Sequence, residues 1–98
     1  MLMLRIEHKD DTLYASLSGK LTKDSTYKLE HYIIPYIKKN QIKSMICDCK
    51  NLKKIDFEGK YALLKTKMVL KEQQGKLLLC DVKKNIKQGL IGYRMRIL

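Results

Sequence analysis

The chain has 98 residues, enough for one domain around a single hydrophobic core, and 45% of them are hydrophobic, which argues against disorder. No run approaches the roughly 20 apolar residues that cross a bilayer, and the first residues lack the charge order of a signal peptide, so we expect a cytoplasmic protein without membrane insertion. The net charge of +11 admits nucleic acid or an acidic protein as a partner.

The first half of the chain predicts a β-hairpin followed by a helix. Residues 3–8 and 13–18 flank a polar turn and predict two paired strands, the second ended by Gly19. The next segment has apolar residues at helical spacing, and its predicted buried face consists of Leu29, Tyr32, Ile33, Tyr36 and Ile37.

Local signals set the expected limits of this helix. Asp24 and Thr22 both have side-chain oxygens that can cap its N-terminus. Pro35 has no backbone N–H to donate, which predicts a kink or a break. Asn40 tolerates the left-handed conformation, so we expect the helix to end there.

The second half predicts alternating strands and helices. Residues 44–49 read as a short buried strand that is followed by a loop and then by a helix over residues 57–73, which Asp56 caps and Gly75 ends. Residues 76–80 read as a central strand covered on both faces. A third helix follows, with Val82, Ile86 and Leu90 on one face, and the alternating tail that contains Tyr93, Met95 and Ile97 suits an edge strand. The order β-β-α-β-α-β-α-β predicts an α/β fold, a mixed sheet packed with α-helices in a single domain over residues 1–98.

The predicted helix over residues 57–73 has two apolar stripes on opposite sides. One stripe carries small residues that let a helix approach a sheet, and we assign it to the core: Gly59, Ala62, Leu63, Thr66, Val69 and Leu70. The other is richer in aromatic residues and Met: Phe57, Tyr61, Leu64 and Met68. This second stripe is either an interface or is covered by a neighbouring helix.

No pattern of catalytic residues is present, so we expect no enzyme activity. The sequence contains no nucleophile motif and no glycine-rich phosphate loop. The neighbouring acids Asp48, Asp56 and Glu58 are better explained by capping and loop hydrogen bonds than by catalysis. The three cysteines are interpreted as small buried hydrophobic residues in a reducing compartment, and we expect neither a metal nor another cofactor.

The stretch from Cys47 to Gly59 resembles the STAS domain of bacterial anti-sigma factor antagonists, also called anti-anti-sigma factors. In that family an apolar strand ends in Asp, and Ile-Asp-Ser-Ser-Gly opens a helix. Leu17-Ser18-Gly19-Lys20-Leu21 is similar to the turn before the first helix of the family. The resemblance extends to about Leu90 and implies a regulator of transcription that acts by partner switching, with phosphorylation of the second Ser of the motif releasing an anti-sigma factor that is also a serine kinase.

This chain departs from the family at the switch. The phospho-acceptor position is occupied by Glu58, which cannot be phosphorylated, and Phe57 precedes it. Three readings stay open: a permanent mimic of the modified state, a constitutive binder, or a STAS subunit of a scaffold or transporter complex. Ser25, Thr26 and Thr66 remain available hydroxyls, although capping or core packing explains each of them better.

The resemblance and the apolar stripe together predict a protein-binding surface for an anti-sigma factor or serine kinase-like protein. Its predicted contact residues are Asp56, Phe57, Glu58, Gly59, Lys60, Tyr61, Leu64 and Met68. Two alternatives remain, a small basic nucleic-acid-binding protein and a homodimer formed through the same stripe.

Overall fold

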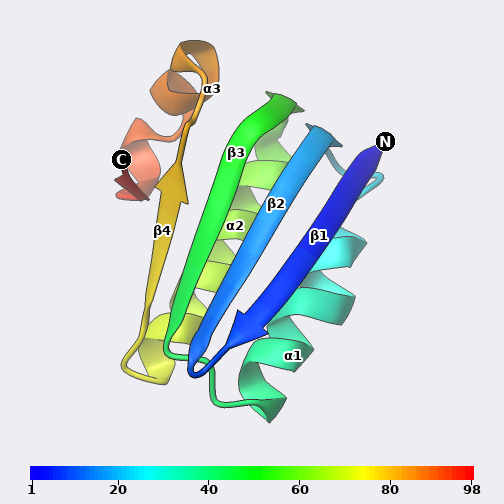
Figure 1. Cartoon of the computed structure of the whole chain (residues 1–98). Coiled ribbons are helices and arrows are strands. Elements are labelled where there is room, and N and C mark those ends of the chain that lie inside the picture. The colour runs from blue at the N-terminus through cyan, green and yellow to red at the C-terminus, as the bar shows by residue number, and fades with distance from the viewer.

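A computed structural model describes residues 1–98 as one α/β layer pair (Figure 1). The sheet has five strands in the order β1-β2-β3-β4-β5, with β1 antiparallel to β2 and all other neighbours parallel. The strands are β1 (Leu2–Lys9), β2 (Thr12–Leu21), β3 (Ser44–Ile55), β4 (Lys76–Cys80) and β5 (Arg96–Ile97). The helices are α1 (Ile34–Lys39), which continues a π-helix (Lys28–Ile33), α2 (Phe57–Glu72) and α3 (Lys84–Gly89), and a 3-10 turn (Ile91–Tyr93) follows α3. The predicted mixed sheet and the predicted order of elements are confirmed.

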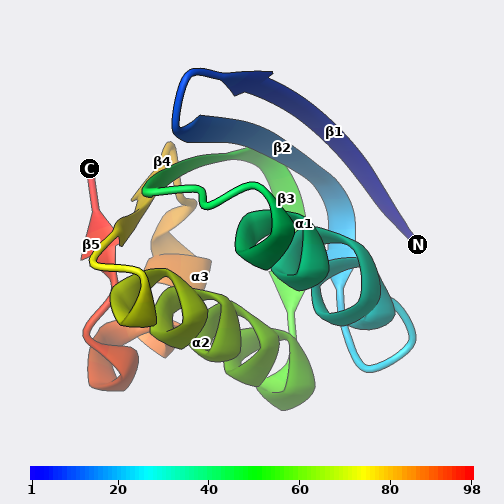
Figure 2. The same cartoon turned by 90° about the horizontal axis from the view of Figure 1, so that it is seen from below.

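The helices α1 and α2 both lie on one side of the curved sheet (Figure 2). The core therefore forms between that side and the two helices, and the strands alternate between buried and accessible residues. The prediction that residues 76–80 are covered on both faces is wrong: Leu77 and Leu79 are buried, whereas Leu78 and Cys80 face the open side and stay partly accessible. A run of apolar residues indicates burial of a strand but does not reveal how many layers cover it.

The strands β2 and β3 run farther than predicted. Gly19 does not end β2, which continues to Leu21 with Gly19 at φ +98°. A side chain at Gly19 would collide with the backbone carbonyl of Met1, so this position requires Gly. The predicted loop after Cys49 is likewise strand, because residues up to Ile55 pair with the extended part of β2 after register shifts in the ladder.

The first helix begins and ends differently from the prediction. Neither Asp24 nor Thr22 caps it through its side chain, and the chain enters the π-helix through a series of turns after Leu21. The irregularity expected at Pro35 is present: the segment before it is a π-helix, and an α-helix continues through it. The left-handed residue at the end of α1 is Gln41 (φ 52°), not Asn40, whose φ is −101°.

The buried faces of the helices follow the predicted stripes with two exceptions. Val82 and Leu90, which were predicted on one face of the third helix, lie just outside α3, whose buried residue is Ile86. Leu29, Ile33 and Ile37 are buried, but Tyr32 is 61% exposed, because the π-helix turns it away from the face that its spacing predicted. In α2 the small-residue stripe faces the sheet: Gly59, Ala62, Leu63, Thr66 and Leu70 are buried, and Val69 is partly buried against the core. The predicted tail strand contains only Arg96 and Ile97, which pair in parallel with β4.

Candidate functional site

The N-terminus of α2 is held in place by the carboxylate of Asp56. One oxygen accepts a hydrogen bond from the Gly59 N–H at 2.8 Å, which confirms Asp56 as the N-cap. The other oxygen accepts from the Lys23 N–H at 2.9 Å, and the Asp56 N–H itself donates to the Leu21 carbonyl. The cap thus joins three segments: the end of β2, the turns after it and the first turn of α2.

These contacts change the pKa of the Asp56 carboxyl group. Desolvation raises the pKa of Asp56, but the hydrogen bonds from Gly59 and Lys23 and the nearby Lys54 charge outweigh it, so the pKa is lowered from its ordinary value. Asp56 is therefore an ionised acceptor at neutral pH. With both oxygens engaged, its part in the predicted binding surface is to fix the geometry of the first turn.

Gly59, in the first turn of α2, lies against the end of β2. A Cβ at this position would collide with the Leu21 carbonyl oxygen and would lie 2.8 Å from Cγ1 of Ile55, so only Gly lets the first turn of α2 sit this close to β2. Gly59 is buried and exposes almost no area of its own. Gly59 therefore contributes to the predicted binding surface by letting the backbone of α2 lie close to β2.

The other predicted contact residues gather on the outer side of α2. Phe57 is 66% exposed, Met68 54% and Tyr61 49%, whereas Leu64 between them is partly buried. Of the two alternatives for this stripe, cover by a neighbouring helix does not hold for Phe57, Tyr61 and Met68, which stay exposed. We call Phe57, Tyr61, Leu64 and Met68 the outer stripe.

Charged residues border the outer stripe. Glu58 is exposed in the first turn of α2, where the helix dipole favours a negative charge, and its carboxylate forms no ion pair. Lys65 forms the one ion pair in the structure, with Glu30 of the π-helix, and its Nζ lies 4.9 Å from the centre of the Tyr61 ring. On the other border, half-buried Lys60 extends towards Gly89 of α3. Apolar area at the centre and charges at the rim are typical of a protein interface.

The alternative phospho-acceptors differ in accessibility. The Ser25 hydroxyl is buried, accepts from the Thr22 N–H at 3.0 Å and lies within hydrogen-bond distance of the Lys20 and Thr22 carbonyls. The Thr66 hydroxyl is buried and donates to the Ala62 carbonyl at 2.8 Å. Both hydroxyls therefore serve the folded structure. Thr26 is partly accessible, and its hydroxyl donates to the Lys23 carbonyl at 3.4 Å.

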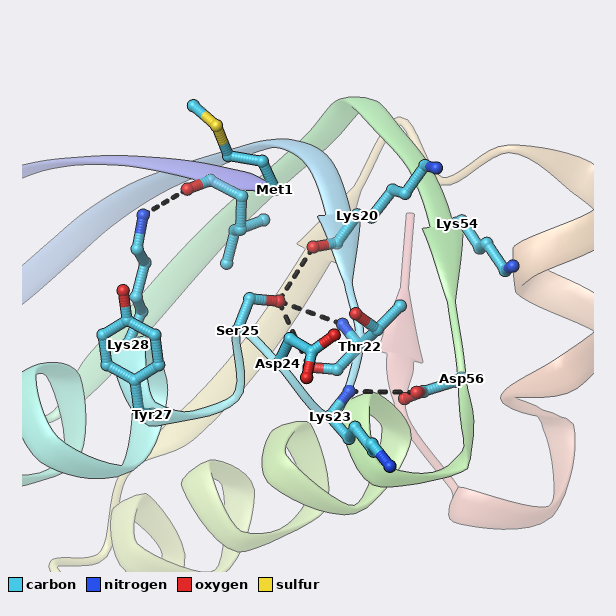
Figure 3. Close-up of a pocket in the computed structure, with 11 residues that line it drawn as sticks. Met1, Lys20, Thr22, Lys23, Asp24, Ser25, Tyr27, Lys28, Lys54 and Asp56 are labelled. Atoms are coloured by element: carbon cyan, nitrogen blue, oxygen red, sulfur yellow. Dashed lines mark hydrogen bonds between the residues drawn. The ribbon is translucent and has the colours of Figure 1, made fainter.

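A recess of about 560 Å³ opens beside Asp56 (Figure 3). The turns after β2 form its wall, with Ser25 at the centre and Lys23 bound to Asp56. Lys20, Lys28 and Lys54 add positive charge to the lining, and Asp24 and Asp56 oppose it. This recess was not predicted from the sequence. The segment Leu17–Leu21 was its one local signal, because it leads into the turns that contact Asp56.

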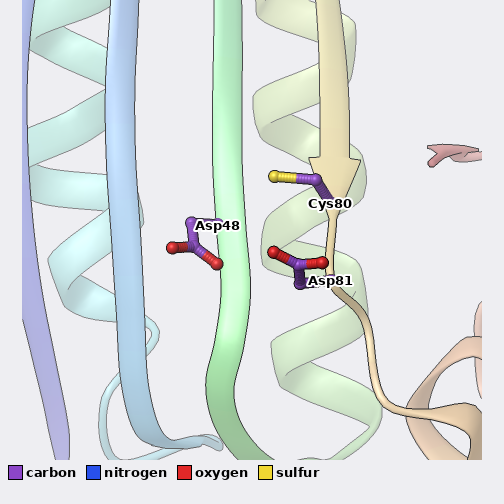
Figure 4. Close-up of side chains that lie close together, drawn as sticks. All are labelled: Asp48, Cys80 and Asp81. Carbon is purple, nitrogen blue, oxygen red and sulfur yellow. The ribbon is translucent and has the colours of Figure 1, made fainter.

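The cysteines fall on two faces of the sheet. Cys47 and Cys49 face the core, where the hydrogen bond to Cys49 and burial raise the pKa of Cys47 well above its ordinary value. Cys80 lies on the open face, and its Sγ and the carboxylates of Asp48 and Asp81 gather within 4.8 Å (Figure 4). Burial, Asp48 and Asp81 raise the pKa of Cys80, which favours the protonated thiol over the thiolate that binds metals. The prediction of three buried cysteines holds for Cys47 and Cys49.

Solved structures with the same fold include anti-sigma factor antagonists. SpoIIAA in its unphosphorylated form superposes with a TM-score of 0.83 at 15% identity, covering 98% of this chain and 87% of that one. The phosphorylated form of SpoIIAA from Bacillus gives 0.80 at 17% identity, covering 98% and 91%. A Ser-to-Glu variant of RsbS from Moorella thermoacetica also gives 0.80, at 15% identity, covering 97% and 85%.

The amino-acid sequence itself shows the family to which the chain belongs. No curated protein sequence matches the chain. No helix is both long enough and apolar enough to span a membrane. The family model of the STAS domain, however, matches residues 3–91. The chain therefore belongs to the STAS domain family.

Proposed function

We propose that this protein is a non-enzymatic, cytoplasmic regulator that acts like an anti-sigma factor antagonist and binds a protein partner through the outer stripe and the first turn of α2. The single observation that carries the proposal is the exposure of Phe57, Tyr61 and Met68 beside the capped helix start, in a chain of the STAS family. Exposed aromatic and Met side chains of this kind supply the central contacts of protein interfaces.

The proposed partner is an anti-sigma factor or serine kinase-like protein, as for antagonists of this fold. Glu58 carries a permanent single negative charge in the first turn of α2, where a phosphate would carry between one and two at neutral pH. Glu58 cannot receive the phosphate that releases the partner in the family, so binding is constitutive and is not switched. The existence of a Ser-to-Glu variant of RsbS with this fold supports the idea that such a charge is compatible with a STAS domain.

The test is co-purification of the chain with the candidate anti-sigma factor, followed by titration calorimetry of the purified pair. Phe57→Ser and Met68→Ser should each weaken binding about tenfold or more while the fold is retained. Ile91→Ser is the matched control, because Ile91 is 74% exposed outside the outer stripe, and it should bind like the wild type. Equal affinity of all four proteins would contradict the proposed surface.

A second arm of the experiment tests the fixed switch. Glu58→Ser restores a hydroxyl at the family's acceptor position, so incubation with the kinase-like partner and ATP should phosphorylate this variant and leave the wild type unmodified. A Glu58→Ser variant that binds the partner and is never phosphorylated would refute the assignment of Glu58 to the switch. Sedimentation of the wild type as a dimer that Tyr61→Ser dissociates would instead assign the outer stripe to self-association.

A further inference from the structure

A second recess lies at the opposite end of α2 from Glu58, and nearly all its lining side chains are positively charged. Its volume is about 290 Å³, and its lining consists of Lys67, Lys71, Gly75, Lys76, Leu77, Arg94 and Arg96. Five of these seven residues are cationic and none is acidic. The recess beside Asp56 differs in this respect, because two carboxylates there oppose the lysines.

The cationic residues come from separate elements that the fold brings together. Lys67 and Lys71 belong to α2, Lys76 begins β4, and Arg94 and Arg96 lie in the C-terminal segment. The dipole of α2 accounts for a cation such as Lys71 in its last turn, but it does not account for Lys76 or the two arginines.

The C-terminal segment is held against α2 and β4. The Lys67 ammonium donates to the Arg94 carbonyl at 2.7 Å, and the Leu98 N–H donates to the Leu79 carbonyl at 2.8 Å. Arg96 pairs with Leu78 in the sheet ladder. The backbone that carries both arginines is therefore fixed on either side of the recess. The cations of the recess have no carboxylate partner, because the one ion pair of the structure joins Lys65 to Glu30.

We propose that this recess binds a compact polyphosphate anion, with inorganic pyrophosphate as the simplest example. Arg presents a planar fork of donors that matches phosphate oxygens, and Lys adds a point charge. Five cations suit more than one phosphate group, because a single phosphate carries only about 1.5 to 2 negative charges at neutral pH. No aromatic side chain lines the recess to stack on a base, which favours a free phosphate compound over nucleic acid. The proposal is independent of the partner-binding function.

Titration calorimetry of the whole chain with sodium pyrophosphate tests it. We expect saturable one-to-one binding that weakens with added salt. The double variant Arg94→Gln/Arg96→Gln should bind about tenfold more weakly, since each exposed charge contributes up to about 1 kcal/mol, which is about fivefold in affinity. The control Lys84→Gln/Lys87→Gln removes the same charge from α3, outside the recess, and should stay within about twofold of the wild type.

Three results would overturn the proposal. The first is an absence of saturable binding by the wild type. The second is equal weakening by both double variants, which would indicate a diffuse effect of net charge. The third is binding of a single-stranded oligonucleotide but not of pyrophosphate, which would make the recess part of a nucleic-acid surface. Circular dichroism checks that each variant folds, and Lys71→Gln, with an expected loss of about threefold, replaces the arginine pair if that variant does not fold.

Discussion

The carboxylate of Asp56 accepts a hydrogen bond from the backbone N–H of Lys23, which lies 33 residues earlier in the chain, and it also caps α2. One side chain therefore couples the start of α2 to the turns that lead from β2 towards the first helix. The outer stripe begins at the residue after Asp56, so the position of Phe57 and Glu58 depends on this coupling. Removal of the carboxylate should loosen two segments at once.

Asp56→Ala should lower the free energy of unfolding by about 2 kcal/mol, at the upper end of the cost of a lost N-cap, because a second acceptor is lost with it. Asp56→Asn keeps one acceptor oxygen and should cost about 1 kcal/mol. Urea denaturation measures both. Asp24→Ala is the control, since the exposed Asp24 side chain accepts no hydrogen bond, and it should change stability by less than about 0.5 kcal/mol. Equal effects at positions 24 and 56 would contradict this account of the cap.

The same carboxylate predicts a pH dependence. The folded-state pKa of Asp56 is lowered, so the stabilisation is present above the ordinary Asp pKa of about 3.9 and is lost as the pH falls through the folded value. The difference in unfolding free energy between wild type and Asp56→Asn should therefore narrow as the pH is reduced from about 6 to about 3. Other carboxylates titrate in both proteins and cancel in the difference. A difference that stays constant over this range would refute ionisation as the cause.

Gly59→Ala separates helix propensity from tertiary packing. Propensity alone favours Ala in a helix by about 1 kcal/mol, but the added methyl group would collide with the Leu21 carbonyl. We expect a net destabilisation of about 2 kcal/mol or more, measured by thermal or urea unfolding. Gly92→Ala is the control, because nothing lies within 4 Å of a Cβ placed there, and it should be nearly neutral.

The sequence predicted α2 closely and β3 poorly, for a physical reason. Asp56, the small-residue stripe and the apolar stripe are local signals, and they suffice to place the helix and its two sides. The segment Lys50–Ile55 contains three lysines and one Asn, which predict a loop, yet it continues β3 because the extended end of β2 offers it a ladder of partners. Strand pairing between distant segments outweighs local propensity, and one sequence does not display that pairing.

In the candidate site too, local features were predictable from the sequence and contacts between distant segments were not. The spacing of residues along one helix predicted the outer stripe. It could not predict that the stripe stays exposed, because the exposure depends on where α1 and α3 pack. The contact between Asp56 and Lys23 depends on the turns after β2, whose conformation the sequence did not reveal. The cationic recess likewise combines residues from α2, β4 and the C-terminal segment, and only the fold brings them together.

Substitutions on the two sides of α2 should lower the stability by very different amounts. Leu63 is fully buried on the sheet side, and Leu63→Ala should cost about 3 kcal/mol of unfolding free energy. Phe57→Ser removes a larger side chain from the outer stripe, but it should cost less than about 0.5 kcal/mol because Phe57 is already exposed. Urea denaturation of the isolated chain distinguishes them. A large loss of stability in Phe57→Ser would mean that the outer stripe contributes to folding and is not a free binding surface.

The thiols of the sheet should differ in reactivity with iodoacetamide. Cys80 is partly accessible on the open face and should be the one cysteine labelled in the folded protein, whereas Cys47 and Cys49 should react after unfolding. Burial and the charges of Asp48 and Asp81 raise the pKa of Cys80, so its labelling at about pH 8 should be slow.

Asp48→Asn and Asp81→Asn each remove a negative charge beside Cys80, and each should lower the thiol pKa and accelerate its labelling, as followed by mass spectrometry over time. Asp24→Asn, which makes the same change in net charge outside this cluster, is the control and should label at the wild-type rate. If all three variants label alike, the thiol is controlled by access alone. The acceleration predicted for the first two variants requires instead that the carboxylates act on the thiol through their charge.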